Sequence, residues 1–363
     1  MTLSRALYME WAKGRPVPAI DLAGSNLLAC SLSDLPGARE SLDLAGDSPE
    51  GYGPLLEAIA ARHGVGPDRV ALAGGCAGAN FLACAALLDT GDEVLVERPA
   101  YDPLPAAARM LGASVRFFDR RFEDGWALDP DRMAAALTPR TRLVIVSSPH
   151  NPTGTVASGE ALTALGRLAE RGGFHILVDE VYRDCVVSNR PAPAATLSPA
   201  FISSSSLTKA YGLASLRCGW TLASPDVTQR IRRARDVVDG NGPAPVERLA
   251  ALAFANLDSL AARAHALIEA NGRLVGAFLA RRADLECVPS SATIAFPRFR
   301  GGRDASPFVE RLFRDHGVAV VSGSFFDAAR HFRVSFGGAT EKLHRGLAAI
   351  ASCLDASPPN PGA

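Results

Sequence analysis

Short apolar runs alternate with amphipathic segments along the chain from about residue 50 to residue 223. Seven runs are rich in aliphatic, β-branched or aromatic residues and predict strands: Val70–Gly74, Glu93–Glu97, Ser114–Asp119, Arg142–Ser148, His175–Asp179, Phe201–Ser205 and Cys218–Ala223. Helices are predicted between them at Pro54–His63, Ala79–Leu88, Pro103–Leu111, Pro130–Leu137 and Gly159–Arg171. Strands that alternate with helices are typical of a parallel sheet covered on both faces. The pattern therefore predicts an α/β fold built on a mainly parallel seven-stranded sheet.

A second, smaller α+β domain is predicted after Asp239–Pro243, where glycines and a proline interrupt the pattern. Its expected elements are a long helical stretch over Val246–Arg281, strands at Thr293–Phe296, Val318–Val321 and Phe332–Ser335, and a last helix at Glu341–Leu354. We therefore expect a large domain over 49–240 and a small domain over 241–356. Residues 1–48 lack a long periodic run and are expected to form an N-terminal arm and part of the small domain. The Pro-rich residues 357–363 are expected to be a disordered tail.

The basic residues are divided very unevenly between lysine and arginine. The chain has 38 Lys and Arg against 38 Asp and Glu, and its only lysines are Lys13, Lys209 and Lys342. The zero net charge argues against a protein that binds nucleic acid through bulk phosphate attraction. Because lysine is so rare here, a motif that requires a lysine is far more informative than one that requires an arginine.

Other sequence features exclude several further classes of protein. The seven cysteines are scattered, and no Cys-x-x-Cys or His-Glu-x-x-His occurs, so neither a disulfide framework nor a metal site is expected. The first residues lack the apolar core of a signal peptide, and the apolar run Phe81–Leu88 is too short to span a membrane. We therefore expect a soluble, cytoplasmic protein with no membrane or nucleic-acid partner.

A glycine-rich loop, Gly74–Asn80, follows the first strand and opens a helix. Backbone N–H groups at such a helix start form an anion site suited to phosphate, although a plain strand-to-helix turn would also explain the glycines. A dinucleotide site is another alternative, because Glu97 ends the next strand where a ribose-binding carboxylate would be expected. The spacing Gly-Gly-x-x-Gly differs from the dinucleotide fingerprint and gives that alternative little support.

Two polar motifs end apolar strands at the edge where α/β sheets bind ligands. The first, Ser147–Gly154, is a turn built on two prolines and a glycine, and it places Asn151 at that edge. The second, His175–Tyr182, places Asp179 at the end of a buried strand. A carboxylate there is costly unless a cation or hydrogen bonds satisfy it, so either a partner cation or a solvated strand end is expected.

The stretch Ser203–Lys209 brings one of the three lysines to the end of the sixth predicted strand, with Arg217 eight residues later. A partly desolvated lysine has a lowered pKa and can act as a nucleophile or base. Lys342, on a charged helix, and Lys13, in the arm, are poorer candidates. Ser206-x-x-Lys209 also matches the acyl-serine signature of penicillin-recognising enzymes, but the Lys-Thr-Gly that those enzymes need is absent.

A late arginine, Arg333, lies within an apolar strand, and its flanks favour an inward-facing role such as a bidentate grip on a carboxylate. In chain order, an anion loop, Asn-Pro-Thr-Gly, Asp-x-x-Tyr, Ser-x-x-Lys with a following arginine, and this late arginine resemble the fold type I pyridoxal-phosphate enzymes, specifically the class I/II aminotransferases. The resemblance covers nearly the whole chain, from Tyr52 to Arg333. It implies pyridoxal 5'-phosphate as cofactor, an α-amino acid and a 2-oxo acid as substrates, and a homodimer with shared active sites.

The resemblance also implies roles for single residues around the cofactor ring. Lys209 would form the Schiff base and then move the proton between the substrate Cα and the cofactor. Asp179 would pair with the ring nitrogen and keep it protonated, so that the ring can take up electrons. Tyr182 and Asn151 would hydrogen-bond the ring 3-hydroxyl oxygen. Tyr101 would stack on the ring.

Phosphate and substrate contacts follow from the same resemblance. The phosphate would be held by backbone or side-chain groups of Cys76, Ala77, Gly78, Ser206 and Arg217, and by Tyr52 of the neighbouring subunit. Arg333 would bind the α-carboxylate of the substrate, and Asn151 and Gly24 would also contact the substrate. The side-chain pocket is expected to involve the segments 21–27 and 239–242. The sequence does not indicate a second arginine that would bind a side-chain carboxylate. The substrate could therefore be a neutral, an aromatic or an acidic amino acid.

These motifs fit more than one reaction. A pyridoxal-phosphate lyase or synthase on the same fold would use the same residues, because the reaction depends on which Cα bond is aligned with the ring. A non-catalytic, effector-binding domain of this fold is a third alternative. A nicotinamide enzyme built on the glycine loop would leave Asn151, Asp179 and Lys209 unexplained. The aminotransferase is the interpretation that uses every motif.

Overall fold

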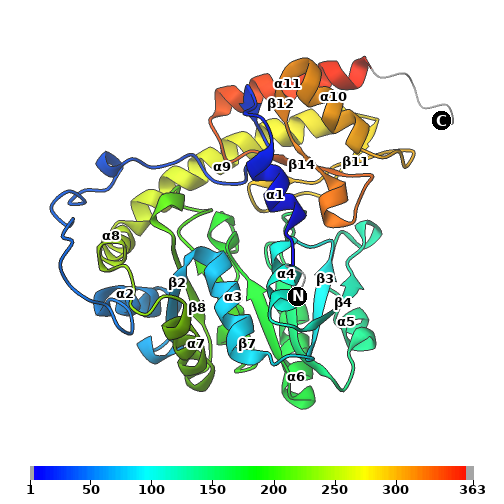
Figure 1. Ribbon diagram of the computed structural model, residues 1–363. Helices are drawn as coiled ribbons and strands as arrows, with labels where there is room; N and C mark the ends of the chain where they lie inside the picture. The colour runs from blue at the N-terminus through cyan, green and yellow to red at the C-terminus, as the bar shows by residue number, and fades with distance from the viewer. Residues whose placement is uncertain (1–3, 357–363) are drawn as a thin grey trace.

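The structure is a computed structural model that describes residues 4–356 (Figure 1). The tail predicted over 357–363 lies outside the described residues. Figure 1 shows a sheet with its helices in the lower half and a smaller unit, built from α9, α10 and α11, above it. Among residues 4–356, no helix is both long enough and apolar enough to cross a membrane.

The central sheet has seven strands in the order β2-β8-β7-β6-β5-β3-β4. Its strands are β2 (Val70–Gly74), β3 (Glu93–Arg98), β4 (Ser114–Asp119), β5 (Thr141–Ser147), β6 (His175–Asp179), β7 (Phe201–Ser206) and β8 (Cys218–Leu222). β8 runs antiparallel to both of its neighbours, and the other pairs are parallel. All seven predicted runs form strands of this sheet, with ends shifted by one residue at most. The predicted fold class is confirmed.

Helices cover both faces of the sheet, because successive strand residues point to opposite sides. They are α2 (Gly53–His63), α3 (Gly75–Leu87), α4 (Pro103–Met110), α5 (Pro130–Ala136), α6 (Gly159–Gly172) and α7 (Pro225–Val238). On one face, Val94 and Val96 pack with residues of α3, α4 and α7. On the other, Leu95 packs with residues of α5 and α6. The sequence pattern did not predict α7, and α3 begins four residues earlier than predicted.

The C-terminal part begins with two helices, α8 (Ala244–Ala255) and α9 (Leu257–Ala280), where one long helical stretch was predicted. The break falls at Asn256, whose side-chain amide donates to the carbonyl of Leu252 and ends α8. The remaining helices are α10 (Ser306–His316), which was not predicted, and α11 (Thr340–Asp355). The strands are β9 (Leu285–Glu286), β10 (Ile294–Ala295), β11 (Arg298–Phe299), β12 (Val318–Ala319), β13 (Val321–Ser322) and β14 (Phe332–Ser335). Apolar side chains such as Phe308 and Phe332 form a separate core for this unit.

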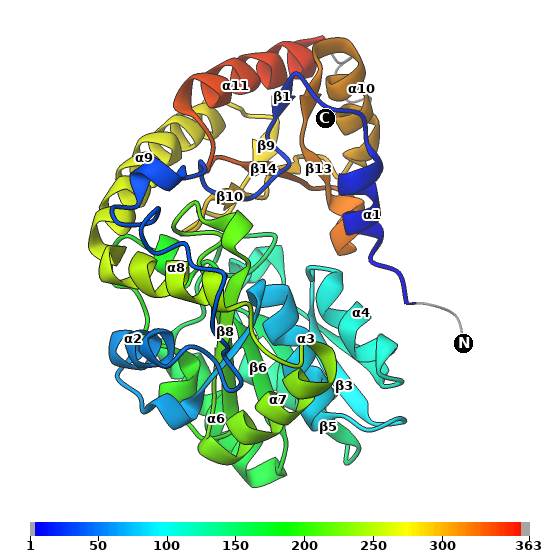
Figure 2. The same ribbon diagram turned by 60° about the vertical axis from the view of Figure 1, so that its left-hand side comes forward.

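The N-terminal segment contains a helix, α1 (Leu7–Gly14), that the sequence pattern did not reveal, and a short strand, β1 (Ile20–Asp21). β1 pairs in parallel with β12, so the segment joins the C-terminal unit. α1 lies between that unit and α4 (Figure 2). Tyr8 fixes it there, because its backbone N–H donates to Asp102 Oδ2 (2.8 Å) and its ring packs against Phe325 and Phe326.

Short 3₁₀ turns connect several elements. They are Leu32–Asp34, Pro67–Arg69, Phe122–Asp124, Arg183–Cys185, Ala194–Thr196, Ala214–Leu216 and Gly323–Phe326. The turn at Ala214–Leu216 leads into Arg217, which has a left-handed backbone (φ 48°). This conformation is rare for a non-glycine residue and often accompanies a functional site.

Candidate active site

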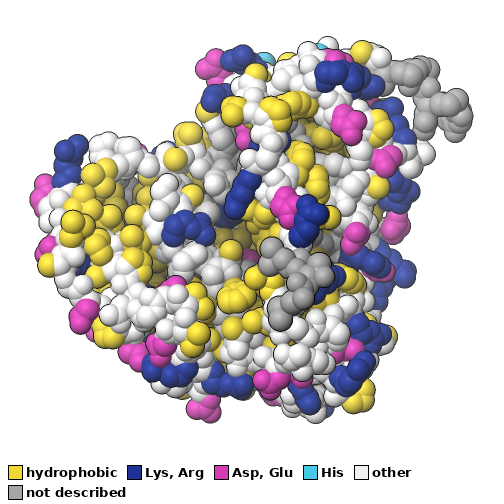
Figure 3. Space-filling view, in the orientation of Figure 1, with side chains coloured by type: hydrophobic (Ala, Val, Ile, Leu, Met, Phe, Trp, Pro, Cys, Tyr) yellow, Lys and Arg dark blue, Asp and Glu magenta, His cyan; other side chains and the backbone are white. Residues whose placement is uncertain are grey.

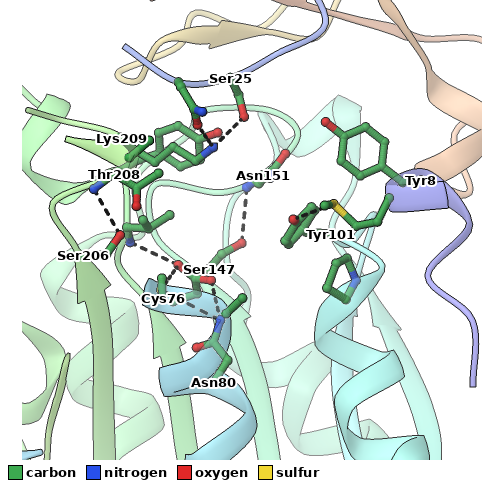
Figure 4. A pocket seen from close by; sticks show the side chains of 18 of the residues that line it. Tyr8, Ser25, Cys76, Asn80, Tyr101, Ser147, Asn151, Ser206, Thr208 and Lys209 are labelled. Atoms are coloured by element: carbon green, nitrogen blue, oxygen red, sulfur yellow. Dashed lines mark hydrogen bonds between the residues drawn. The ribbon is translucent and has the colours of Figure 1, made fainter. Parts of the chain in front are cut away.

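A pocket of about 450 Å³ opens where the parallel strands end, between the sheet, the segment 21–26 and α1 (Figure 4). Ten of the predicted site residues line it: Gly24, Cys76, Ala77, Tyr101, Asn151, Asp179, Tyr182, Ser206, Lys209 and Arg217. Most of them lie at the ends of β6 and β7 or in the segments that follow β2, β3, β5, β6 and β7, which is the edge where α/β sheets place ligands. The fold thus brings distant motifs of the sequence into one site.

Lys209 follows β7, and its ammonium group points into the pocket (Figure 4). Nζ donates to Ser25 Oγ (3.0 Å) and Asn26 Oδ1 (2.7 Å). Burial and the nearby Arg333 lower the pKa of Lys209 to about 8, while Asp179 acts in the opposite direction. A larger share of this amine is therefore neutral near physiological pH than of an ordinary lysine.

We expect capture of an aldehyde by Lys209 to follow the titration of this amine. Only the neutral amine has a free electron pair, so the rate should rise with pH and level off above about pH 8. The measurement is the rate at which the cofactor-free protein takes up pyridoxal phosphate between pH 6 and 11, followed by absorbance. A midpoint near 10.4, the ordinary lysine value, would contradict the lowered pKa.

Asp179 ends β6 and is almost fully buried. Its carboxylate accepts hydrogen bonds from the Val181 backbone (3.1 Å), Asn80 Nδ2 (2.8 Å) and Cys76 Sγ (3.4 Å). Burial raises the pKa of Asp179, and these hydrogen bonds oppose that rise. No salt bridge to this carboxylate forms within residues 4–356, so Asp179 is an anionic group that could pair with a cation of a ligand.

Sequence reasoning did not identify Asn80 as part of the site. It stands one turn after Cys76 on α3, so both side chains point toward Asp179. Asn80 Oδ1 also accepts a hydrogen bond from Ser204 Oγ, which fixes the orientation of the amide. The i, i+4 spacing from Cys76 was no signal at the level of the sequence, because the predicted helix began only at Ala79 and the observed one begins at Gly75.

The other end of the pocket is built for an anion. Arg217 reaches the start of α3 and donates from Nη2 to the Gly74 carbonyl (3.2 Å). Gly75 has φ +77°, and a Cβ there would lie 2.3 Å from Arg217 Nη2, so only glycine allows this approach. The first turn of α3, with Cys76 and Ala77 lining the pocket, supplies free backbone N–H groups.

Arg333 is completely buried in β14 behind the pocket. Its Nη1 donates to Asn151 Oδ1 (2.8 Å), and its Nη2 donates to Tyr8 Oη (2.7 Å) and the Ala23 carbonyl (3.0 Å). The arginine is therefore covered by pocket-lining residues rather than open to the pocket itself. Tyr8 was missed by sequence reasoning, because it lies on the short helix α1 in the predicted arm.

A buried ion pair supports the loop that carries Asn151. Glu97 accepts from Arg120 Nη1 (2.9 Å) and from the backbone and hydroxyl of Ser147, and both charged side chains are fully buried. Asn151 in turn donates its backbone N–H to Ser147 Oγ (3.2 Å). Glu97 is thus fully engaged inside the protein and is not available to a ribose, which removes the dinucleotide alternative.

We expect Glu97→Gln to lower the free energy of unfolding by about 3 kcal/mol. The substitution leaves the Arg120 guanidinium buried without a counter-ion, and an arginine cannot shed its proton to escape the cost. Urea denaturation measures the change. Glu123→Gln, which removes an exposed partner of Arg298, is the matched control and should shift the midpoint little. Equal effects of the two substitutions would contradict this prediction.

Besides Arg333, three predicted elements of the site lie outside the pocket lining. Gly78 lies in the first turn of α3, facing Ala73. Tyr52 donates its backbone N–H to Glu247 Oε2 (2.7 Å), and its ring lies under Arg248. The segment 239–242 is likewise absent from the lining. The roles predicted for these residues stay predictions, and for Tyr52 the expected contact involves a second subunit.

The groups that meet in the pocket fit pyridoxal 5'-phosphate. The amine of Lys209 suits an aldehyde, the unpaired carboxylate of Asp179 suits a pyridine nitrogen, and the Arg217 end suits a phosphate. Tyr182 Oη is buried and has no hydrogen-bond partner within the described part of the chain, so it can serve a ring hydroxyl. Tyr101 adds an aromatic face at the pocket wall.

Comparison with known proteins agrees with this chemistry. The profile of the family described as aminotransferase class I and II matches residues 42–350. The capreomycidine synthase of Streptomyces vinaceus is 38% identical over 83% of this chain and 78% of its own length. The probable aspartate/prephenate aminotransferase of Thermus aquaticus is 30% identical, over 84% of this chain and 82% of its own.

Solved structures show the same fold over almost the whole chain. A pyridoxal-phosphate-dependent aminotransferase from Streptococcus suis is 25% identical, has a TM-score of 0.91 and is aligned over 99% of this chain and 100% of its own. The aspartate aminotransferase of Thermus thermophilus with maleate is 26% identical, with a TM-score of 0.85 over 96% of this chain and 94% of its own. Enzymes of this family use pyridoxal 5'-phosphate to move amino groups between amino acids and 2-oxo acids. The chain belongs to the class I and II aminotransferase family.

Proposed function

We propose that Lys209 is both the covalent anchor of the cofactor and the base of the transamination. The observation that carries this is the convergence of a lysine with a lowered pKa, a buried carboxylate and an anion cradle in one pocket. When bound, pyridoxal phosphate supplies an aldehyde that condenses with amines and a ring that takes up electrons released at the substrate Cα.

The residues around the bound cofactor would then have separate roles. Asp179 holds a positive charge at the ring nitrogen, and Tyr182 with Asn151 orients the ring hydroxyl. Arg333 binds the α-carboxylate of the substrate, once that carboxylate replaces the hydrogen bond now made to Tyr8. Lys209, freed by the incoming amine, moves the proton from Cα. It can do so because its lowered pKa lets it accept and release a proton near neutral pH.

A two-step spectral experiment tests the proposed function. A pool of amino acids is added to the protein loaded with pyridoxal phosphate, and the visible band of the bound cofactor is followed. Transamination predicts that the band bleaches and that a 2-oxo acid added afterwards restores it. A band that never responds to amino acids, under conditions where the protein holds the cofactor, would reject this function.

A second candidate is favoured by the relative that is named a synthase. Capreomycidine synthase shares 38% of its aligned residues with this chain, against 30% for the aspartate/prephenate aminotransferase. The site residues would serve a synthase or lyase equally well, since the same ring takes up the electrons. Product formation from an amino acid in the absence of any 2-oxo acid would favour this candidate.

We also propose a homodimer with shared active sites. Several leucines of the segment 28–44 are exposed, namely Leu28, Leu32, Leu42 and Leu44, and Leu44 is 88% exposed. Figure 3 shows apolar side chains gathered on its left side, where Figure 1 draws residues 28–50 and α8. A contiguous apolar surface of this kind suits a subunit interface. Tyr52 lies outside its own pocket and would contribute to the partner's phosphate site.

Hybrid dimers give an expected result for Tyr52. The variants Tyr52→Ala and Lys209→Ala should each capture cofactor poorly, the first by about tenfold in affinity because a hydrogen bond to a charged phosphate is lost. Co-expressed, they should form dimers with one intact site, combining Lys209 of one subunit with Tyr52 of the other. Borohydride-fixed cofactor at limiting concentration measures this recovery. Absence of recovery in isolated hybrids would place Tyr52 in its own subunit's site or in none.

We also propose the boundaries of the two domains and a cytoplasmic location. We place the large domain at 49–240 and the small domain at 241–356, joined by the arm whose strand β1 pairs with β12. The seven cysteines are all free, which suits the reducing cytoplasm.

A further inference from the structure

The segment 21–26 runs past the groups that would orient a substrate. Ser25 and Asn26 accept hydrogen bonds from Lys209, where the amino group of the substrate reacts. The Ala23 carbonyl accepts one from Arg333, where the α-carboxylate binds. Asp21 precedes Ala23 by two residues, so its Cα lies within about 8 Å of that of Ala23. An amino-acid side chain can span this distance.

The carboxylate of Asp21 is fixed in place but remains open to the pocket. Oδ1 accepts from the backbone N–H groups of Ala23 (2.8 Å) and Gly24 (3.1 Å), and Oδ2 accepts from Arg15 Nη2 (2.7 Å). The side chain is still 45% exposed, and it lines the pocket. A Cβ at Gly24 would lie in van der Waals contact with Oδ2 (3.6 Å), so a larger side chain at this position would stand against the carboxylate.

The Arg15 guanidinium donates to the Asp21 carboxylate, and little of the Arg15 side chain is exposed to a ligand. Its side chain is only 11% exposed, and the guanidinium carbon lies 4.9 Å from the centre of the Trp11 ring. Nε and Nη1 are shielded from solvent, without a hydrogen-bond partner within residues 4–356. Both residues line the pocket, and the Asp21 side chain is the more exposed of the two, so the carboxylate offers a substrate group the larger open surface.

Part of the wall of the pocket that Asp21 lines is apolar. It is formed by Met9 and Ala12 of α1 and by Leu104 and Ala107 of α4. These side chains suit an aliphatic stem, and the one weak acceptor among them, Met9 Sδ, already accepts from Tyr101 Oη (3.2 Å). The site therefore combines Arg333, which would bind the α-carboxylate, with an apolar wall and the negatively charged side chain of Asp21.

We propose that Asp21 is a specificity-determining residue, and that it selects α-amino acids with a cationic group at the end of an aliphatic side chain. This inference rests on the proposed function, since Lys209 and Arg333 set the position of the α-amino acid. A guanidinium or ammonium group donates to Asp21 Oδ2, and the opposite charges of the two groups strengthen this hydrogen bond. Gly24, predicted as a substrate contact, acts by leaving that oxygen uncovered.

Arginine and citrulline provide a matched pair of probes, because citrulline carries a neutral ureido group in place of the guanidinium. We expect arginine to bleach the bound-cofactor band at a half-saturating concentration at least about tenfold lower than citrulline. Asp21→Asn should bring the two values together. The side-chain amide introduced by this substitution would keep an oxygen for the Ala23 and Gly24 backbone groups, so the local turn is retained.

Two further variants separate the charge from the fold. Gly24→Val leaves Asp21 in place but covers Oδ2, so it should also remove the preference for arginine over citrulline. If Asp21→Asn does not fold, this variant tests the role of the Asp21 carboxylate. Asp304→Asn is the control, because Asp304 also accepts from a backbone N–H two residues on but lies outside the pocket. It should leave the arginine preference unchanged.

The outcomes distinguish failure of this inference from failure of the proposed function. If acidic or neutral amino acids bleach the band as readily as arginine in the unmodified protein, the selection by Asp21 is rejected while transamination stands. If Arg15→Gln abolishes a preference for acidic amino acids, Arg15 is the selecting residue and the inference is overturned. If no amino acid changes the band, the proposed function itself fails.

Discussion

Lys209→Ala should abolish covalent capture of the cofactor and lower turnover by at least about 10⁴-fold. The substitution removes the one lysine amine that lines the pocket among the described residues. Two losses follow, because the same Nζ both anchors the cofactor and moves the proton at the substrate Cα. Borohydride reduction followed by mass analysis measures the first loss, and the amino-acid half-reaction measures the second.

The two other lysines of the chain are natural controls for this experiment. Lys13 and Lys342 are exposed and lie outside the pocket, so Lys13→Ala and Lys342→Ala should retain both the fixed cofactor and the bleaching by amino acids. Borohydride labelling that persists in Lys209→Ala would contradict the assignment. Labelling that disappears in all three variants would show that the assay reports on something other than the active-site amine.

The strands and the Lys209 motif could be predicted from the sequence because both signals are local. Buried parallel strands are continuous apolar runs, and each of the seven runs became a strand of one sheet. Lys209 stood out because lysine is rare in this chain. Since the carboxyl ends of parallel strands share one edge, the motifs that follow β5, β6 and β7 had to meet there.

Other parts of the site depend on contacts between distant segments and could not be found this way. Helix α1 has only eight residues, too few for a periodic signal, and tertiary contacts such as those of Tyr8 with Arg333 hold it in place. The pairing of Arg15 with Asp21 was hidden among many arginines, and only the pocket shows which arginine borders the substrate side. The two-residue strands β9 and β11, which were not predicted, are defined by their pairing with each other rather than by their own pattern.

Asp179→Asn should lower turnover by about 10²-fold or more while leaving the cofactor covalently bound through Lys209. The isosteric amide keeps an acceptor for the Val181 backbone but can no longer hold a positive charge at the ring nitrogen. Electrons released at the substrate Cα are then stabilised less well, so the loss should fall on kcat and the spectral half-reaction rather than on capture. In the folded protein without cofactor, the new amide nitrogen faces Asn80 Nδ2, and the loss of that hydrogen bond offsets the gain from removing a buried carboxylate whose charge burial disfavours.

The neighbouring residue supplies the control for this last prediction. Glu180 is also buried, burial raises its pKa to about 7, and it accepts from the Ala194 backbone outside the pocket. Glu180→Gln therefore removes a buried carboxylate of the same segment without touching the cofactor site, and turnover should stay close to that of the unmodified enzyme. A loss confined to Asp179→Asn, with capture intact, would show that the charge itself drives the reaction. Equal losses in both variants would instead assign the effect to the packing of the β6 end, and unchanged turnover in Asp179→Asn would remove this carboxylate from the chemistry.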